Sequence, residues 1–165
     1  MGSAVAWELT CALLERGLPP PFTLVVSGRN PPHDRRLHDD LSVLDDAEFI
    51  RRVAAMGGTP AEVFASPEIV ALFLPVLRAD FTLLAHHRVA MPTRPLACDL
   101  LFLHGVDDAR VDADGIDGWR AYTRGRLEVQ AYPGGHFYLQ TQHDAVCARV
   151  ARHLRACRAA AAVVP

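Results

Sequence analysis

The sequence predicts an α/β protein with three mainly parallel strands, flanking helices and a helical insertion. Three apolar runs have the length and composition of buried strands, at residues 22–26, 96–103 and 127–132. Segments with helical periodicity lie between them, and strands that alternate with helices are typical of a parallel sheet. The chain has 165 residues and half of them are hydrophobic, so we expect one domain over residues 1–158.

The first elements are a helix and a strand. Residues 4–16 place apolar side chains around most of a helix, which predicts burial on several sides, and Gly17 ends this helix. The β-branched run at residues 22–26 is a short strand that ends at Ser27. Residues 29–42 are polar and rich in turn residues, so we expect an exposed crossing there.

A helical insertion follows the first strand, at about residues 36–90. Its helix start and stop signals are Asp45 with Glu48, Gly57–Gly58, Thr59–Pro60 and Ser66–Pro67–Glu68. The last helix of the insertion keeps an apolar period, and Pro75 should kink or limit it. Two interpretations stay open at this point: plain core packing, or a lid over a site at the edge of the sheet.

The remaining segments complete the alternation. The nearly continuous apolar character of residues 96–103 predicts a strand covered on both faces. A helix from about Asp114 to Thr123 and the strand at 127–132 come next. A final helix is expected over residues 144–156, with a frayed tail at 159–165.

Charge and composition narrow the classes of function. The net charge is -2 and there is no basic run, which argues against nucleic acid or an anionic membrane as the partner. We expect no apolar stretch long enough to span a bilayer. The four cysteines are widely spaced and form no CxxC motif, which predicts reduced thiols in a cytoplasmic protein.

Two loops carry the candidate catalytic residues. Residues 104–108 follow one apolar run and contain Asp107 and Asp108, while residues 132–139 follow the next run and contain His136 on a glycine-rich turn. The carboxyl ends of neighbouring parallel strands meet at one edge of a sheet, where open α/β sheets bind their ligands. A histidine held by a buried aspartate is two thirds of a nucleophilic triad, so the sequence predicts acid and base here.

Other polar residues are weaker candidates. His33, His38, His104, Asp112 and the pair His86–His87 match no zinc spacing, so we expect no metal and no cofactor. Ser3 is a poor candidate for the nucleophile. It would lie inside the first helix, without the strained turn between a strand and a helix that exposes a nucleophile.

Five stretches together resemble a type II thioesterase. They are Met1–Leu9, Val26–Arg29, Leu74–Asp80, Gly105–Asp108 and Gly134–Phe137. Type II thioesterases are stand-alone α/β-hydrolases that work beside modular polyketide and nonribosomal peptide synthetases. The resemblance runs from the first residue to about residue 154, and it implies the C-terminal part of an α/β-hydrolase fold in which the insertion is the lid.

The resemblance also assigns roles within a Ser-Asp-His triad. His136 matches the family's base. Asp108 is preferred over Asp107 as the acid, because the side chain three residues after Gly105 should turn back toward the histidine and because this position matches the family. Asp107 would then be solvated. The family's nucleophile motif reads Gly-His-Ser-Met-Gly and this chain begins at the Met, so we expect the serine just before Met1, with the Met1 backbone as an oxyanion-hole donor.

The implied function is hydrolysis of acyl thioesters on phosphopantetheine carrier domains, which clears misprimed or stalled acyl groups during polyketide or nonribosomal peptide synthesis. The implied partners are acyl or peptidyl carrier domains. Without the serine, we expect this chain to be inactive alone. Two alternatives stay open: another α/β-hydrolase that acts on esters or peptides, and a non-catalytic remnant that binds carrier domains.

Overall fold

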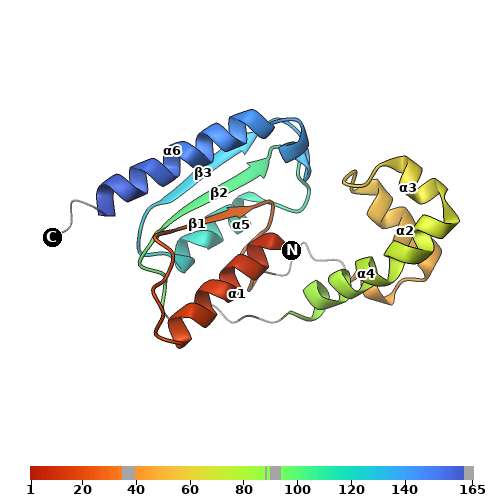
Figure 1. Cartoon of the computed structure of the whole chain (residues 1–165), viewed down its shortest axis with the longest axis horizontal. Helices are drawn as coiled ribbons and strands as arrows, with labels where there is room; N and C mark the ends of the chain where they lie inside the picture. The colour runs from red at the N-terminus through yellow and green to blue at the C-terminus, as the bar shows by residue number, and fades with distance from the viewer. Residues whose placement is uncertain (35–39, 88, 90–93, 162–165) are drawn as a thin grey trace.

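The computed structural model describes residues 1–34, 40–87, 89 and 94–161 (Figure 1). Its centre is a sheet of three parallel strands in the order β1 (Thr23–Ser27), β2 (Asp99–Gly105) and β3 (Leu127–Tyr132). Leu101 of β2 lies between Val25 of β1 and Glu128 of β3. The three parallel strands are therefore confirmed, and the bounds predicted for the third strand are those observed.

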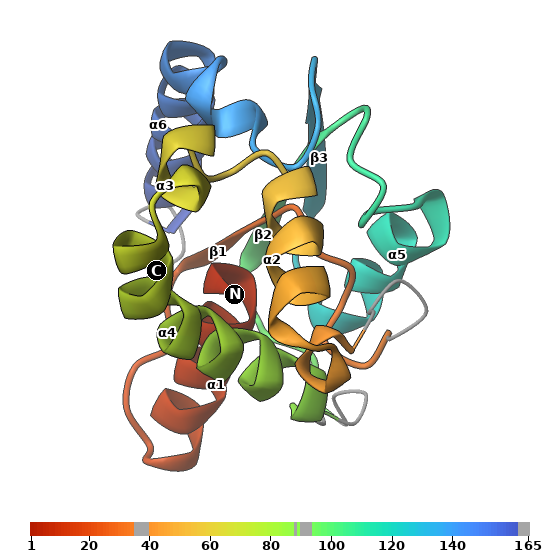
Figure 2. The ribbon, with the colours of Figure 1, turned by 90° about the vertical axis from the view of Figure 1, so that its right-hand side faces the viewer.

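Helices cover both faces of the sheet. Neighbouring side chains of β2 point to opposite faces, so they pack against different helices. Leu100 and Phe102 pack with α1 (Gly2–Glu15), α5 (Ala113–Gly118) and the 3₁₀ turn η2 (Trp119–Tyr122) on one face. Leu101 and Leu103 pack with α6 (His143–Ala161) on the other. Figure 2 shows α5 and α6 on opposite sides of the sheet. The prediction that this strand is covered on both faces is confirmed.

The prediction that the first helix is buried on several sides is wrong for the described structure. Trp7 and Ala4 of α1 are buried, but Val5 is 53% and Leu9 is 58% exposed. The helix contacts the sheet and the η2 turn along one side only. The apolar residues on its other side therefore face outward.

The insertion is helical, as the sequence predicts, and its described residues 41–86 are called the lid below after the family resemblance. It contains η1 (Leu41–Val43), α2 (Asp46–Ala55), α3 (Ala61–Ala65) and α4 (Pro67–His86). Asp45 and Ser66 cap α2 and α4, as the sequence predicts, and Pro75 lies inside α4 without ending it. The expected lid boundaries near 36 and 90 lie outside the described residues. Figure 1 shows the lid beyond the carboxyl ends of the strands.

The expectation that no apolar stretch is long enough to span a bilayer is wrong for one lid helix. By length and composition alone, α4 meets the requirements of a membrane-spanning helix. In the structure it packs against α3 and η1, with Leu74, Leu77 and Phe81 around the buried ring of Phe49. Some of the apolar side chains of α4 are therefore packed inside the lid.

The prediction of an exposed crossing at residues 29–42 is also wrong in its first part. Asn30 is 1% exposed, and its side-chain amide donates to Asp34 Oδ2 at 3.1 Å and to Asp112 Oδ1 at 3.2 Å. A Cβ on Gly115 would lie 1.9 Å from Asn30 Oδ1, so this glycine makes room for the amide. Buried hydrogen bonds therefore hold a segment whose polarity predicted exposure.

The C-terminal helix is longer than predicted. α6 continues through Ala161, beyond the expected end at residue 156, so the first residues of the expected frayed tail are helical. Residues 162–165 lie outside the described structure. Between β3 and α6, the chain makes a short 3₁₀ turn, η3 (Tyr138–Gln140), which follows His136.

Candidate active site

The loops after β2 and β3 are joined by backbone hydrogen bonds. The Val106 N–H donates to Tyr132 O at 2.9 Å, and the Asp107 N–H donates to Gly134 O at 3.0 Å. A Cβ on Gly105 would lie 2.3 Å from the carbonyl oxygens of Gly134 and Gly135. Because any side chain at 105 would collide with this backbone, the glycine allows the two loops to lie in contact.

This contact brings Asp108 and His136 together. His136 Nδ1 lies 2.8 Å from Asp108 Oδ2, and the Arg110 N–H donates to Asp108 Oδ1 at 3.0 Å. The Asp108 side chain is 1% exposed, whereas the His136 side chain is 32% exposed. A carboxylate accepts hydrogen bonds, so this geometry favours the tautomer in which Nδ1 donates and Nε2 has the lone pair. This arrangement suits a general base.

The neighbouring carboxylate does not take part in this pair. Asp107 is exposed, and the contact it makes with the histidine loop is through its backbone N–H. Of the two aspartates that the sequence offers, Asp108 is the one whose side chain turns toward His136.

The Ser27–Gly28 turn, for which the sequence predicted no role in the site, lies against this pair. Gly28 follows β1 with φ +59, and a Cβ there would lie 3.2 Å from His136 Cε1 and 3.4 Å from Asp108 Oδ2. The preceding Ser27 Oγ shares a hydrogen bond of 2.7 Å with Tyr138 OH. The sequence signals were a Ser-Gly pair at the end of an apolar run, which marks a turn, and the family resemblance of Val26–Arg29, and neither names a partner for this turn.

The start of α1 is fixed to the same turn. Ser3 Oγ donates to Ser27 O at 2.8 Å and accepts from the Ser27 N–H at 2.9 Å. Ser3 is therefore engaged in holding the helix to β1. The other serine hydroxyls of the chain also bond elsewhere: Ser27 to Tyr138, Ser42 to Asp40 and Ser66 to Glu68.

Met1 precedes α1 and caps it through its carbonyl, which accepts from Ala4 N at 2.8 Å. Burial, followed by the positive charges of Arg29 and Arg110, lowers the pKa of the Met1 amino group, while Asp80 opposes the shift. Burial disfavours charge of either sign at this position, and the two further causes of the lowering are both positive charges.

Each candidate metal ligand among the described residues has another contact. His33 Nδ1 lies 2.7 Å from Tyr122 OH, and Asp112 caps α5. The remaining imidazoles contact Gly105 O (His104), Thr82 O (His86) and Glu8 (His87). His38 lies outside the described residues. Within the part of the chain that the structure describes, no group of three or more His, Cys, Asp or Glu side chains could hold a metal ion.

The lid touches the loops that carry Asp108 and His136 through the turn that ends α2. A Cβ on Gly58 would lie 2.0 Å from Phe137 Cζ, so the glycine rests on the ring next to His136. Arg110 Nη2 lies 3.4 Å from Met56 Sδ. The sequence signal for this turn was Gly57–Gly58, which predicted the end of a helix but not what it contacts.

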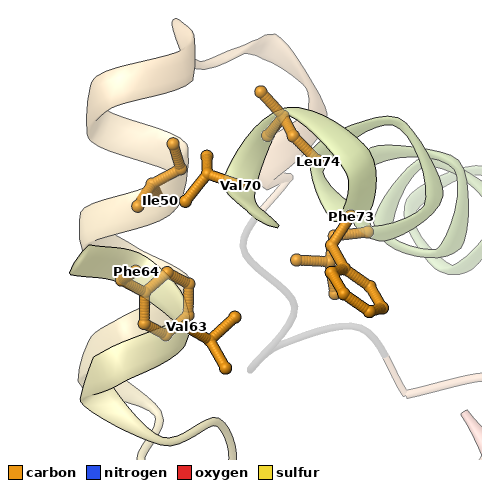
Figure 3. Close-up of a pocket in the computed structure, with 7 residues that line it drawn as sticks. Ile50, Val63, Phe64, Val70, Phe73 and Leu74 are labelled. Atoms are coloured by element: carbon orange, nitrogen blue, oxygen red, sulfur yellow. The ribbon is translucent and has the colours of Figure 1, made fainter. Parts of the chain in front are cut away.

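The lid also contains an apolar pocket (Figure 3). Side chains of α2 and α3 face those of α4 across it, and the lining exposes no polar surface. The lining residues are Ile50, Val63, Phe64, Val70, Phe73, Leu74 and Leu77. These side chains form the apolar interior of the lid.

Comparison with known proteins gives consistent matches. The family described as "Thioesterase domain" matches residues 1–155. Thioesterase PikA5 of Streptomyces venezuelae is 33% identical over 163 residues, which cover 97% of this chain and 56% of that protein. ClbQ from the colibactin NRPS/PKS pathway has a TM-score of 0.88 at 26% identity, covering 96% of this chain and 66% of that chain.

The type II thioesterase YbtT from the yersiniabactin NRPS/PKS pathway has a TM-score of 0.81 at 32% identity, covering 94% of this chain and 63% of that chain. The chain spans about half the length of the curated relatives that it matches.

Proposed function

The chain belongs to the thioesterase family, and from this we propose that it supplies the acid and the base of a serine hydrolase that cleaves acyl thioesters. The observation that carries the proposal is the hydrogen bond between buried Asp108 and half-exposed His136, in adjacent loops after parallel strands. The family and its α/β-hydrolase fold supply the reaction class.

In the proposed reaction, His136 Nε2 takes the proton of a serine hydroxyl as the serine oxygen attacks the thioester carbonyl. The carbon–sulfur bond breaks, and the proton passes from His136 to the leaving thiolate. Water, deprotonated by the same nitrogen, then attacks the acyl-serine; the bond from the acyl carbon to the serine oxygen breaks, His136 returns the proton to that oxygen, and the free acid is released. Asp108 fixes the tautomer of His136 and stabilises the imidazolium that forms in each half-reaction.

We propose that the nucleophile is a serine that directly precedes Met1 and that the Met1 backbone N–H then donates to the oxyanion. The four serine hydroxyls of the chain are engaged elsewhere, which supports a nucleophile outside these residues. The positive charges of Arg29 and Arg110 act on the start of α1 and would offset part of the cost of burying an oxyanion there.

We propose carrier domains with phosphopantetheine thioesters as partners, and clearance of misprimed or stalled acyl groups as the biological role. Support comes from the relatives, which are named for polyketide and nonribosomal peptide pathways. The lid helices, which carry apolar side chains such as Val70 and Phe73, would form the acyl pocket and part of the carrier-docking surface. The proposed location is the cytoplasm, consistent with the free cysteines of the described structure.

The test starts with the DNA that precedes the Met1 codon in the same frame. If it encodes Gly-His-Ser, the protein that carries these residues should release acyl groups from loaded carrier protein. Substituting His136→Ala in that protein should lower the rate by several orders of magnitude. An in-frame stop codon would contradict the proposed serine and favour a non-catalytic protein that binds carrier domains.

A parallel assay separates thioesterase from esterase. The same acyl group is offered on carrier protein and as a simple oxygen ester, and the two values of kcat/KM are compared. Preference for the carrier thioester supports the proposal. A higher value for the oxygen ester would assign the chain to another class of α/β-hydrolase, which would use the same Asp108 and His136.

A further inference from the structure

We infer that the Ser27–Gly28 turn at the end of β1 positions His136 relative to the start of α1. This inference rests on the proposed function, because it concerns how the proposed base is held. Ser27 contacts two elements that the reaction must keep in register: the amino end of α1, through Ser3, and the histidine loop, through Tyr138.

The His136 ring could move if its hydrogen bond were its only contact. A third of its side chain is exposed, and the described hydrogen bond of its ring is to Asp108 Oδ2. One hydrogen bond fixes a distance, but the ring can still rotate about it and swing toward solvent. A second contact is therefore needed to hold the ring plane.

Gly28 provides this second contact. Its Cα lies so close that an added Cβ would be 3.2 Å from His136 Cε1 and 3.3 Å from His136 Nδ1. The same Cβ would lie 3.4 Å from Asp108 Oδ2, so the glycine covers the hydrogen bond itself. The Gly28 N–H donates to Leu103 O at 3.0 Å, which fixes the turn to β2. The pair thus rests against backbone that the sheet holds in place.

Tyr138 holds the loop that carries His136. It is buried, its ring stacks on Tyr132 at 5.3 Å, and its carbonyl accepts from the N–H groups of Thr141 and Gln142. The hydrogen bond of 2.7 Å to Ser27 ties this anchored residue to β1 across 111 positions of sequence. Removing the Ser27 hydroxyl would leave the buried Tyr138 hydroxyl without this partner, and removing either hydroxyl would loosen the loop two residues after His136.

Ser27 also fixes the opposite side of the site. Its backbone N–H and carbonyl both bond to Ser3 Oγ, one turn from the Met1 cap. A hydrogen-bonded path therefore runs from the first turn of α1 through Ser27 to Tyr138. In the proposed reaction this path sets the distance between the oxyanion donor and the base.

The test reads the position of His136 by NMR in the 165-residue chain, with nitrogen-15-labelled histidine. The signal is the Nδ1-bound proton and its exchange with solvent. We expect Ser27→Ala and Tyr138→Phe each to speed this exchange about tenfold. The double variant should be no faster than either single one, because both remove the same bond. Gly28→Ala should shift the ring resonances of His136.

Thr23→Val is the matched control. Thr23 lies at the other end of β1, and its buried hydroxyl bonds to Asp99 O at 2.9 Å and to His153 Nε2 at 2.7 Å. Thr23→Val therefore removes a hydroxyl with two hydrogen bonds from the same strand, away from His136. Unchanged exchange in Thr23→Val supports positioning by Ser27. Equal acceleration in Thr23→Val, or wild-type exchange in both Ser27→Ala and Tyr138→Phe, would overturn the inference.

This readout does not depend on turnover. If the exchange changes as expected but no form of the protein hydrolyses thioesters, the proposed function fails and the positioning of His136 stands. If thioesters are hydrolysed but the exchange does not respond to Ser27 and Tyr138, the positioning fails and the proposed function stands.

Discussion

Gly58 of the lid and Phe137 of the histidine loop are in such close contact that a Cβ on Gly58 would lie 2.0 Å from Phe137 Cζ. The ring of Phe137 in turn meets the His136 ring edge to face, at 5.1 Å between centroids. The lid therefore rests on the residue beside the proposed base. Any change in this contact should affect both the lid and the site.

Gly58→Ala should displace either the lid turn or the Phe137 ring, because the added methyl cannot share the space. Overpacking of this kind costs about 1–3 kcal/mol of the free energy of unfolding. The measurement is urea denaturation, together with the contacts of the Phe137 ring in NMR spectra.

A double-mutant cycle supplies the control for Gly58→Ala. In a Phe137→Ala background the added methyl has room, so the cost of Gly58→Ala should largely disappear. A cost that is the same in both backgrounds would show that the effect does not arise from Phe137.

Asp108→Asn should remove the partner that fixes the His136 tautomer. An asparagine has one carbonyl oxygen, so it cannot accept from both the Arg110 N–H and His136 Nδ1 without turning its NH₂ toward one of them. In the protein that carries the nucleophile, we expect kcat to fall about 10³–10⁴-fold. Nitrogen-15 NMR of the chain should show the other tautomer of His136.

Asp107→Asn is the matched control for this prediction. It removes the same charge one residue away, at an exposed side chain. We expect little change in kcat and none in the tautomer. If both variants lose activity equally, general electrostatics at the loop would explain the loss better than the contact with His136.

Much of this architecture follows from local sequence patterns. β3 has the predicted bounds, and the caps Asp45 and Ser66 begin helices where the sequence places them. A strand needs an apolar run and a cap needs one polar side chain next to free N–H groups, so both can be recognised within a few residues. The close approach of Asp108 and His136 follows from one further rule, the shared edge of parallel strands.

Contacts between distant residues explain what the sequence did not predict. Asn30 reads as a turn residue, yet its partner Asp112 lies 82 positions away. Ser27 and Tyr138 are 111 positions apart, and no local pattern pairs two hydroxyls. Exposure of Val5 on α1 depends on which elements cover that side of the helix, which periodicity alone does not give.

Arg78 of α4 should be the main polar support of the lid. Its guanidinium donates to Asp46 Oδ1 at 2.6 Å and to Leu44 O at 2.8 Å, and it lies 4.6 Å from the centre of the Phe49 ring. Charged hydrogen bonds of this kind contribute about 1.5–3 kcal/mol. We expect Arg78→Met to lower the free energy of unfolding by about that amount, measured in urea.

Arg51→Met is the control for Arg78. Arg51 also pairs with a carboxylate, Glu48, but its side chain is 67% exposed and the pair lies within one helix. Exposed pairs of this type contribute little, so we expect no measurable loss. Equal losses in the two variants would show that Arg78 acts as an ordinary surface charge.

The alkaline stability of the protein should depend on Tyr122. Burial raises the pKa of Tyr122 from 10.0 to about 12, and its hydroxyl contacts His33 Nδ1 at 2.7 Å. Between these two pH values the unfolded chain has lost the phenolic proton and the folded chain retains it. The unfolded state then binds fewer protons, so the free energy of unfolding falls as the pH rises.

The stabilisation from this group is fully present below pH 10 and is lost by about pH 12, a total of about 3 kcal/mol. Burial also raises the pKa values of Tyr132 and Tyr138, so tyrosinate absorbance should appear together with unfolding. Tyr122→Phe should cost about 1 kcal/mol at neutral pH, through the lost contact with His33. Tyr122→Phe should also make the free energy of unfolding fall less steeply between pH 10 and about pH 12, because about one proton fewer distinguishes the folded from the unfolded state. An unchanged decline in Tyr122→Phe would mean that another group controls alkaline unfolding.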